Sequence, residues 1–435
     1  MLQHSLTSED NFQLISEELT RIFSSNFLDD IARKELFVQR TTKLKPKDFV
    51  ALCSVWNQDS GKKSLAQLCG ILDSNQNVSL TTEGLNQRFN EAGVRLLKKV
   101  FHILMGKQFL SHHIPNFHDI DFYRIRILDS TGFELPCQYL GNYRGYHKSG
   151  VKIQLEYELL KGEFIHLEVQ NGRDSDATFG PSLINTIQAN DLIIRDLGYF
   201  SLDELVQIHD RDAYYITRLK PKLLLFTREN HHYTKIDLEE VMEDMEIGEV
   251  REIEDIYVSQ AKKHIPRLIL CKLTDEQTEQ RLIRRNRQEK KKGVKYSHHT
   301  KKLTRLNIFI SNIPYQCIPK EDIQTFYSLR WQVEILFKTW KSLFKIHEVK
   351  KMKMERFECH LYGTLISLLI TSTLAFQIRE SLYRKKKKEI SEFKAISIAL
   401  EYIPILQKTL ISGEYLVSDT IRGHIDKYVR VECTL

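Results

Sequence analysis

Two short apolar runs, each ending at an aspartate, set the strongest limit on how this chain can fold. Residues 122–128 are rich in aromatic and β-branched side chains and lead directly into Asp129. Residues 192–195 form a second such run, which leads into Asp196. Runs of this length and composition are typical of buried strands. The sequence therefore predicts two core strands, each of which ends at an acidic side chain.

A β-hairpin is predicted between the two aspartates. Residues 151–159 alternate apolar and polar side chains, and a Lys-Gly turn leads into residues 163–169, which predicts a hairpin with one buried face. After Asp196, Ser201 and Glu204 have the spacing of a capping box, which predicts the start of a helix. Strands and helices that alternate in this way indicate a mixed α/β core.

The first 116 residues predict helices. Residues 64–72 are amphipathic, an Asp-Ser-Asn turn signal follows, and apolar side chains then recur at three- and four-residue steps from Leu85 to Val100. The longer of these two helices carries four cations: Arg88, Arg95, Lys98 and Lys99. A short helix, a turn and a longer helix could read the major groove of DNA. A helical bundle without a ligand fits the pattern equally well.

Residues 221–306 break the core pattern and predict a β-rich inserted domain. Ten acids lie between Asp237 and Asp255. Residues 281–305 then hold eleven basic side chains against a single acid, Glu289. Such a run either binds a polyanion or is an ordinary solvated loop.

A helix in which cations surround one carboxylate is predicted after a core strand at residues 307–313. It starts at residues 319–322 and continues through Lys345 or beyond. At about 100° per residue, one sector of roughly 80° holds six polar or charged side chains: Tyr327, Arg330, Glu334, Lys338, Lys341 and Lys345. An apolar sector holds Val333, Leu336, Phe337, Trp340 and Phe344. The polar row is either a salt-bridged surface stripe or a place where phosphate lies beside an acid.

Asp129, Asp196 and Glu334 together would meet the needs of phosphodiester cleavage by two metal ions. Mg²⁺ prefers oxygen ligands and keeps several waters. Two metal ions about 4 Å apart activate the attacking oxygen and stabilise the leaving one. Arg330 and Lys341 suit a phosphate at the same place, because Arg binds phosphate through two donors and Lys acts as a point charge.

The spacing Tyr327-x2-Arg330-x3-Glu334-x6-Lys341 reproduces the YREK signature of the insertion-sequence-4 family of bacterial DDE transposases. The segments around Asp129 and Asp196 resemble the contexts of the two catalytic aspartates of that family, in the same order. The resemblance covers most of the chain. It implies an RNase H-like catalytic core, which a β-strand insertion domain interrupts between the second aspartate and the glutamate.

The resemblance also implies cut-and-paste transposition of a bacterial insertion sequence. In the family, water activated by metal ions cuts at the transposon end, the freed 3′ hydroxyl forms a hairpin, and the reopened end joins target DNA. Two Mg²⁺ ions, with Mn²⁺ as an alternative, would be held by Asp129, Asp196 and Glu334. The residues expected to contact DNA are Tyr327, Arg330, Lys338 and Lys341. The expected partners are the terminal inverted repeats, target DNA and a second subunit on the DNA, with no membrane.

One feature of the family is missing from this chain. Well-known relatives stack a flipped base on a tryptophan of the insertion domain, but the three tryptophans here are Trp56, Trp331 and Trp340. Tyr257 or Tyr296 could take this role, because base stacking tolerates any large aromatic face.

Five segments are expected along the chain. They are a helical DNA-binding domain (1–116), the first part of the catalytic core (117–220), the β-rich insertion (221–306), the second part of the core (307–378) and a helical C-terminal region that could support dimerisation (379–435). Seven cysteines without a CxxC pair indicate reduced thiols in a bacterial cytoplasm, where the protein would associate with the nucleoid. Residues 1–10 lack the features of a signal peptide.

Two other classes of function were compared with this prediction. A DNA-binding relative could occupy the inverted repeats without cutting, as a repressor or inhibitor of transposition. An unrelated nuclease, or a peripheral membrane protein anchored by residues 361–378 and the Lys385–Lys388 run, is a further alternative. Residues 361–378 are just long enough to span a membrane, but their Ser, Thr and Gln content favours a buried helix.

Overall fold

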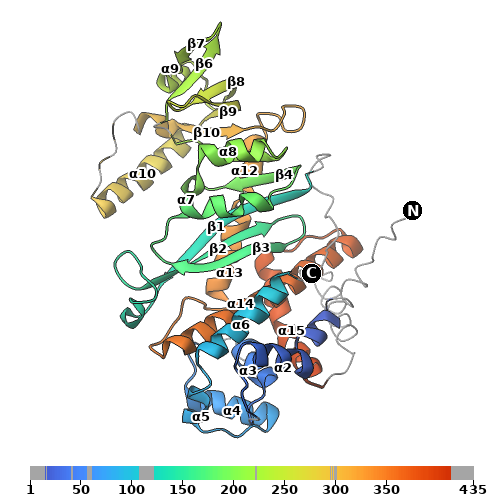
Figure 1. Ribbon diagram of the computed structural model, residues 1–435. Coiled ribbons are helices and arrows are strands. Elements are labelled where there is room, and N and C mark those ends of the chain that lie inside the picture. Colours follow the sequence, from blue (N-terminus) through green and yellow to red (C-terminus); the bar gives the residue numbers. More distant parts are fainter. Residues whose placement is uncertain are drawn as a thin grey trace. The chain divides into compact units, whose positions relative to one another are not determined.

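The computed structural model describes residues 15, 17–40, 43–55, 61–106, 122–220, 223–293, 295, 297 and 301–412. The chain divides into two compact units (Figure 1). Unit 1 comprises Met1–Pro115, Ser130–Arg173 and Glu334–Leu435, and unit 2 comprises Asn116–Asp129 and Asp174–Val333. Each unit therefore combines segments that lie far apart in the sequence.

Unit 2 is built on a mixed sheet. Its strands are β1 (Arg124–Glu134, whose last residues belong to unit 1), β4 (Asp191–Arg195), β5 (Tyr214–Arg218), β6 (Leu225–Glu229), β7 (His232–Lys235), β8 (Val250–Val258), β9 (Lys263–Lys272) and β10 (Leu306–Ser311). Their order is β1-β4-β5-β10-β9-β8-β6-β7. The first three are parallel, whereas β10 and the strands beyond it pair antiparallel. The α/β class expected from the sequence is confirmed.

The helices of unit 2 connect and flank these strands. They are α7 (Asp176–Phe179), η2 (Gly180–Thr186), η3 (Leu197–Tyr199), α8 (Leu202–His209), α9 (Leu238–Glu243), α10 (Asp275–Lys292), η4 (Leu303–Arg305) and α12 (Ile323–Ser328). A hydrophobic core joins side chains of α8, β5, β9 and β10, among them Ile208, Tyr215, Leu268 and Ile308. Burial of this apolar surface is the main force that holds the unit together.

Segment 221–306 contributes β6–β9 to this sheet, since β9 pairs directly with β10. Most of its basic run lies on α10, which starts with a capping box between Thr274 and Gln277 and ends at Gly293 in the left-handed conformation. The solvated-loop interpretation is therefore wrong for residues 281–292. Strong helix formers such as Arg, Lys and Gln extend a helix without any apolar face. The boundaries of the five sequence segments stay predictions.

Unit 1 is largely helical. Its elements are α2 (Ser25–Lys34), α3 (Pro46–Cys53), α4 (Leu65–Gln76), α5 (Thr82–Asn86), α6 (Glu91–Gly106), η1 (Cys137–Tyr139), β2 (Gly150–Glu158), β3 (Glu163–Asn171), α13 (Trp331–Ser342, which begins in unit 2), α14 (Met354–Lys386) and α15 (Glu392–Ser412). Helix α14 packs against α3, α6 and α15 (Figure 1). Residues 354–383 are apolar enough to span a membrane, but 89% of that apolar window is buried inside the protein. The interpretation of residues 361–378 as a buried helix agrees with this burial.

Two boundaries in the N-terminal helices differ from the expectation. Helix α4 continues through the Asp-Ser-Asn signal to Gln76 and ends at Asn77, whose φ of 53° is left-handed. Asn tolerates this conformation and so ends helices. The longer helix is also interrupted after Asn86 and restarts at Glu91. The side chain of Asn90 causes the restart, because it accepts a hydrogen bond from the Gly93 amide at 3.0 Å.

The hairpin of β2 and β3 is confirmed, with Gly162 at a φ of 70° in its turn. The expected exposed face is wrong for β2, because all nine of its residues are buried. A Cβ atom at position 162 would overlap the ring of Phe376 on α14. Alternation of polar and apolar residues therefore does not report exposure in this strand, since the polar face is covered as well.

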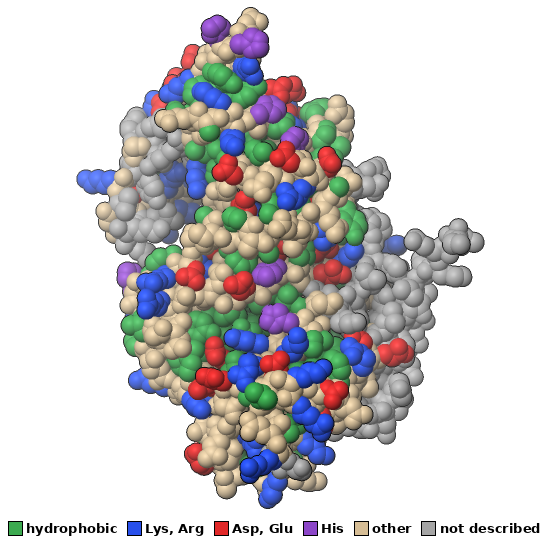
Figure 2. All heavy atoms as spheres, in the orientation of Figure 1, with side chains coloured by type: hydrophobic (Ala, Val, Ile, Leu, Met, Phe, Trp, Pro, Cys, Tyr) green, Lys and Arg blue, Asp and Glu red, His purple; other side chains and the backbone are tan. Residues whose placement is uncertain are grey.

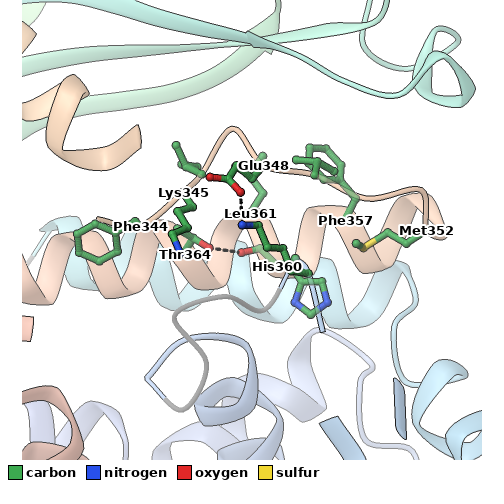
Figure 3. Close-up of a pocket in the computed structure, with 12 residues that line it drawn as sticks. Phe344, Lys345, Glu348, Met352, Phe357, His360, Leu361 and Thr364 are labelled. Atoms are coloured by element: carbon green, nitrogen blue, oxygen red, sulfur yellow. Dashed lines mark hydrogen bonds and ion pairs between the residues drawn. The ribbon is translucent and has the colours of Figure 1, made fainter. Parts of the chain in front are cut away.

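A pocket in unit 1 lies where the segment after α13 meets α14 (Figure 3). His360 is one of its lining residues and is fully buried. Its Nε2 accepts a hydrogen bond from the Nε of Arg356 at 3.2 Å. Burial, followed by the charge of Arg356, lowers the pKa of His360 to about 3.

Candidate active site

The two aspartates lie beside each other in unit 2. Strands β1 and β4 are parallel, and the last pair in their register is Leu128 with Arg195. Asp129 and Asp196 are the next residues of each strand, so both carboxylates emerge at the same edge of the sheet. Acidic side chains where the parallel pairing of two neighbouring strands ends are in the usual position for a ligand site in an α/β sheet.

The two aspartates differ in their position relative to the end of the strand. Asp196 follows the last residue of β4, as expected, and precedes η3. Asp129 does not end β1, which continues to Glu134, so the strand end expected at Asp129 is wrong. In unit 1, the end of β1 is next to β2 in the sheet. This pairing holds the Ser-Thr-Gly segment extended, although its composition alone favours a turn.

Arg330 joins the two aspartates. Its Nη1 donates to Oδ2 of Asp129 at 2.8 Å, and its Nε lies 3.9 Å from Oδ1 of Asp196. The side chains of Arg330 and Asp129 are only 11% and 15% exposed, whereas that of Asp196 is 43% exposed. The pair between Arg330 and Asp129 is therefore a largely buried, charge-assisted hydrogen bond, which is stronger than a surface ion pair.

Arg330 holds this position because the expected continuous helix is broken. Helix α12 ends at Ser328 and α13 begins at Trp331. Between them the chain tightens: the amide of Arg330 bonds the carbonyl of Tyr327 at 3.2 Å, three residues back. Helix α13 ends at Ser342, so Lys345, with a φ of 50°, lies beyond it. The six-residue polar row is thus not one helical stripe.

Tyr327 is the neighbour of this acidic pair on α12. Its side chain is buried, and its ring lies 5.2 Å from that of Phe309 on β10. Burial and then the charge of Asp196 raise the pKa of Tyr327 to about 12, against the opposing effect of Arg330 and Arg218. The hydroxyl therefore stays protonated at neutral pH and keeps a proton to donate.

A buried ion pair involves the residue that precedes the second aspartate. Nη1 of Arg195 donates to Oε1 of Glu204 at 2.8 Å, and both side chains are less than 10% exposed. The capping box expected here is only half formed: Ser201 accepts from the Glu204 amide at 3.4 Å, but the Glu204 carboxylate binds Arg195 instead. The sequence signal for this pair was an arginine at the end of an apolar run, immediately before Asp196.

The remaining predicted site residues belong to unit 1. Glu334 is half-buried in the first turn of α13, and Lys338 is exposed one turn later. Lys341 donates from Nζ to the carbonyl of Gly132 at 3.2 Å, and partial burial lowers the pKa of Lys341. On the opposite face, the expected apolar residues Leu336, Phe337 and Trp340 are buried.

Trp331 lies outside the insertion, next to Arg330 in the chain. Its side chain is exposed at 53%, and the guanidinium of Arg330 lies 5.2 Å from its ring. Tyr257 and Tyr296 were the tyrosines expected to stack a base. Tyr257 is half-buried and packs its ring against Tyr233 and His264, whereas Tyr296 lies outside the described residues, as does Trp56.

The chemistry of Asp129 and Asp196 fits a divalent cation. Both present hard oxygen ligands at one edge, and the single positive charge of the Arg330 guanidinium offsets one of their two negative charges. Within the described residues, no three His, Cys, Asp or Glu side chains gather into a ready metal site. Arg330 thus takes up part of the negative charge in unit 2 that would balance a metal ion.

Residues 120–370 match the family described as transposase DDE domain. The transposase for insertion sequence element IS231E of Bacillus thuringiensis subsp. finitimus is 38% identical over 93% of this chain and 89% of its own length. The transposase for IS1151 of Clostridium perfringens is 31% identical over 96% of this chain and 92% of its own.

A solved structure of the piggyBac transposase synaptic complex with hairpin DNA is also similar, with a TM-score of 0.47 and 10% identity over 95% of this chain and 84% of that one. The mixed α/β sheet and its helices agree with the α/β class expected from the sequence. With a family match over more than half its length and two close full-length relatives, the chain belongs to the DDE transposase family, as the DNA-cutting and strand-transferring enzyme of an insertion sequence.

Proposed function

We propose that this transposase binds the terminal inverted repeats of its own insertion sequence, cuts them by two-metal-ion catalysis through a hairpin, and joins the ends to target DNA. The observation that carries the proposal is the pair Asp129 and Asp196, side by side on parallel strands and bridged by Arg330. A DDE transposase domain depends on divalent metal ions in general. We assign that dependence to two Mg²⁺ ions, with Mn²⁺ as an alternative.

Asp129, Asp196 and Glu334 would hold the metal ions, which supply a polarised nucleophile and stabilise the leaving oxygen. The protein side chains supply position and charge. Asp129 already binds a cation, the Arg330 guanidinium, in a largely buried setting, and a metal ion would take the place of that cation.

Arg330 would move from the aspartates to a DNA phosphate when metal ions bind. Its guanidinium is held by one short bond to Asp129 and lies farther from Asp196. A metal ion at the carboxylates would take over that charge, leaving the two-donor edge of Arg330 for phosphate. Tyr327, which stays protonated, would donate a second hydrogen bond to the same backbone.

Lys338 and Lys341 on α13 would add point charges along the bound strand. The helices of unit 1 also carry many Lys and Arg side chains at the surface, on the face drawn in Figure 2. Phosphate contacts of this kind make binding steeply dependent on salt. We place the working enzyme as a homodimer on the two transposon ends, in the bacterial cytoplasm at the nucleoid.

Trp331 is our candidate for stacking a flipped base in the hairpin step. Its indole is exposed and adjacent to Arg330. Stacking on an exposed aromatic face is worth about 1–3 kcal/mol per base. Tyr257, the alternative within the insertion, is half-buried and already packs against two other rings.

Cleavage of labelled DNA that carries the terminal repeats of the element tests the proposal. Wild type, Glu334→Ala and the matched control Glu321→Ala, an exposed acid of unit 2, are compared with Mg²⁺ and with EDTA. We expect nicks and hairpins only with metal, from wild type and Glu321→Ala, while Glu334→Ala binds the repeats without cutting. If wild type binds the repeats and does not cut under either condition, this chain acts as a repressor or inhibitor of transposition.

A further inference from the structure

A basic pocket in unit 2 lies against α10. It has a volume of about 190 Å³, room for several waters of roughly 30 Å³ each. Its lining residues come from α10 and from the segments before and after it: Leu273, Gln277, Gln280, Arg281, Arg284, Asn307 and Gln324. The lining thus combines two guanidinium groups with four side-chain amides and contains no acid.

Side-chain amides position Arg281, one of the two arginines that line this pocket. Nη2 of Arg281 donates to Oδ1 of Asn307 at 2.5 Å, and Nδ2 of Asn307 donates to Oε1 of Gln324 at 2.9 Å. Asn307 is buried on β10, and Gln324 is in the first turn of α12. The guanidinium is therefore fixed in place by neutral acceptors.

The pocket has an excess of positive charge. Among the described residues, no carboxylate forms an ion pair with Arg281 or Arg284. Burial, followed by the nearby charges of Arg218, Arg285 and Arg284, lowers the pKa of Arg281 to about 10. Cations that repel one another in a half-buried pocket are stabilised by an anion with several acceptor oxygens.

We propose that this pocket binds one phosphodiester of the DNA strand, with Arg281 and Arg284 as its cations and the amides of Gln277 and Gln280 at its wall. The inference rests on the proposed function, which supplies the DNA. The pocket would give helix α10 one fixed contact with the DNA backbone. The other cations of α10 would attract DNA without a fixed contact. A contact of this kind sets the register of the strand and carries no base preference.

Salt dependence of DNA binding tests the pocket. Each neutralised phosphate contributes a slope of roughly −0.9 to a plot of log affinity against log salt, so one lost contact costs on the order of eightfold at 0.1 M salt. We expect Arg284→Gln and the double variant Arg281→Gln, Arg284→Gln to make the slope less steep, by about 1. Lys290→Gln, an exposed cation on another face of α10, removes the same charge and should leave the slope within 0.3 of wild type.

Single methylphosphonate substitutions in the terminal repeat then locate the contact. At one backbone position the neutral linkage should weaken wild type and Lys290→Gln on the order of eightfold and leave the double variant unaffected. Because Arg284 is exposed, we expect Arg284→Gln to fold like wild type. Thermal unfolding shows whether the double variant is folded. Equal slopes for wild type and the pocket variants, or no position at which the double variant differs, would overturn the inference.

A third arm separates DNA from free phosphate as the ligand. Inorganic phosphate titrated into DNA-free wild type should bind only at concentrations well above a millimolar. Tight binding of inorganic phosphate, lost in Arg281→Gln, without a methylphosphonate-sensitive position would show a free-phosphate site and refute the DNA contact. If wild type fails to cut its terminal repeats while the slope difference persists on unrelated duplex DNA, the proposed function fails and the phosphodiester pocket stands.

Discussion

Replacing Arg330 by glutamine should strengthen the binding of Mg²⁺ to the DNA-free protein. Arg330 donates to Asp129 at 2.8 Å with both side chains largely buried, and it lies 3.9 Å from the more exposed Asp196. A hydrogen bond to a charged group contributes about 1.5–3 kcal/mol, while the more exposed contact contributes less than about 1 kcal/mol. A metal ion must displace this guanidinium, so the free energy of Mg²⁺ binding to wild type is less favourable by about 2 kcal/mol.

The expected gain for Arg330→Gln is therefore on the order of 10- to 100-fold in Mg²⁺ affinity, since about 1.4 kcal/mol corresponds to tenfold. Without metal, the variant should be about 2 kcal/mol less stable, because Asp129 loses its partner beside a second carboxylate. Calorimetric titration of Mg²⁺ and the shift of the unfolding midpoint measure both effects, with the exposed Lys338→Gln as a matched loss of one charge. Equal or weaker Mg²⁺ binding by Arg330→Gln would refute the competition between Arg330 and metal.

Three further predictions concern single side chains. His360 binds a proton near its ordinary pKa of 6.5 in the unfolded chain but only near 3 in the folded one. The free energy of unfolding should therefore fall as pH drops below 6.5, by about 2 kcal/mol between pH 7 and pH 5. Denaturant unfolding of His360→Gln should show a smaller loss of stability over the same pH range. Gly363→Ala would drive a methyl group into the carbonyl of Cys53, and chemical unfolding should report a loss of about 1–3 kcal/mol or more; unchanged stability would show that α14 and α3 can separate freely. Tyr327→Phe should slow cleavage roughly tenfold by removing one donated hydrogen bond without moving the pH profile between pH 7 and 9, because the Tyr327 pKa of about 12 keeps it protonated; a shifted profile would indicate that the tyrosine ionises.

Short-range patterns predicted much of this molecule. The apolar runs before Asp129 and Asp196 became adjacent parallel strands, and the alternating segment became the β2–β3 hairpin. Such signals are local: burial in a strand needs a short apolar run, and a tight turn needs a residue such as Gly162. The apolar face of α13 followed equally directly from helical periodicity.

Features that depend on tertiary contacts were not predictable in the same way. The break between α12 and α13 contains no Gly or Pro, and Arg330 occupies it with its side chain on Asp129, a residue 201 positions away. The Ser-Thr-Gly segment after Asp129 stays extended because β1 continues beside β2. The Glu204 carboxylate pairs with Arg195 and does not complete the capping box, because a buried arginine charge is stabilised by a paired acid.

The measurement that most directly tests the central claim is metal rescue of cysteine variants. Asp129→Cys, Asp196→Cys and Glu334→Cys replace a hard oxygen ligand by a soft sulfur one, which Mg²⁺ binds poorly. Cleavage of terminal-repeat DNA is followed with Mg²⁺ and with Mn²⁺, beside Glu321→Cys as a control. We predict that the three site variants bind DNA, fail to cut with Mg²⁺ and recover part of their activity with Mn²⁺, while the control cuts with both. Cleavage by any of the three at the wild-type rate with Mg²⁺ would contradict the assignment of that carboxylate as a metal ligand.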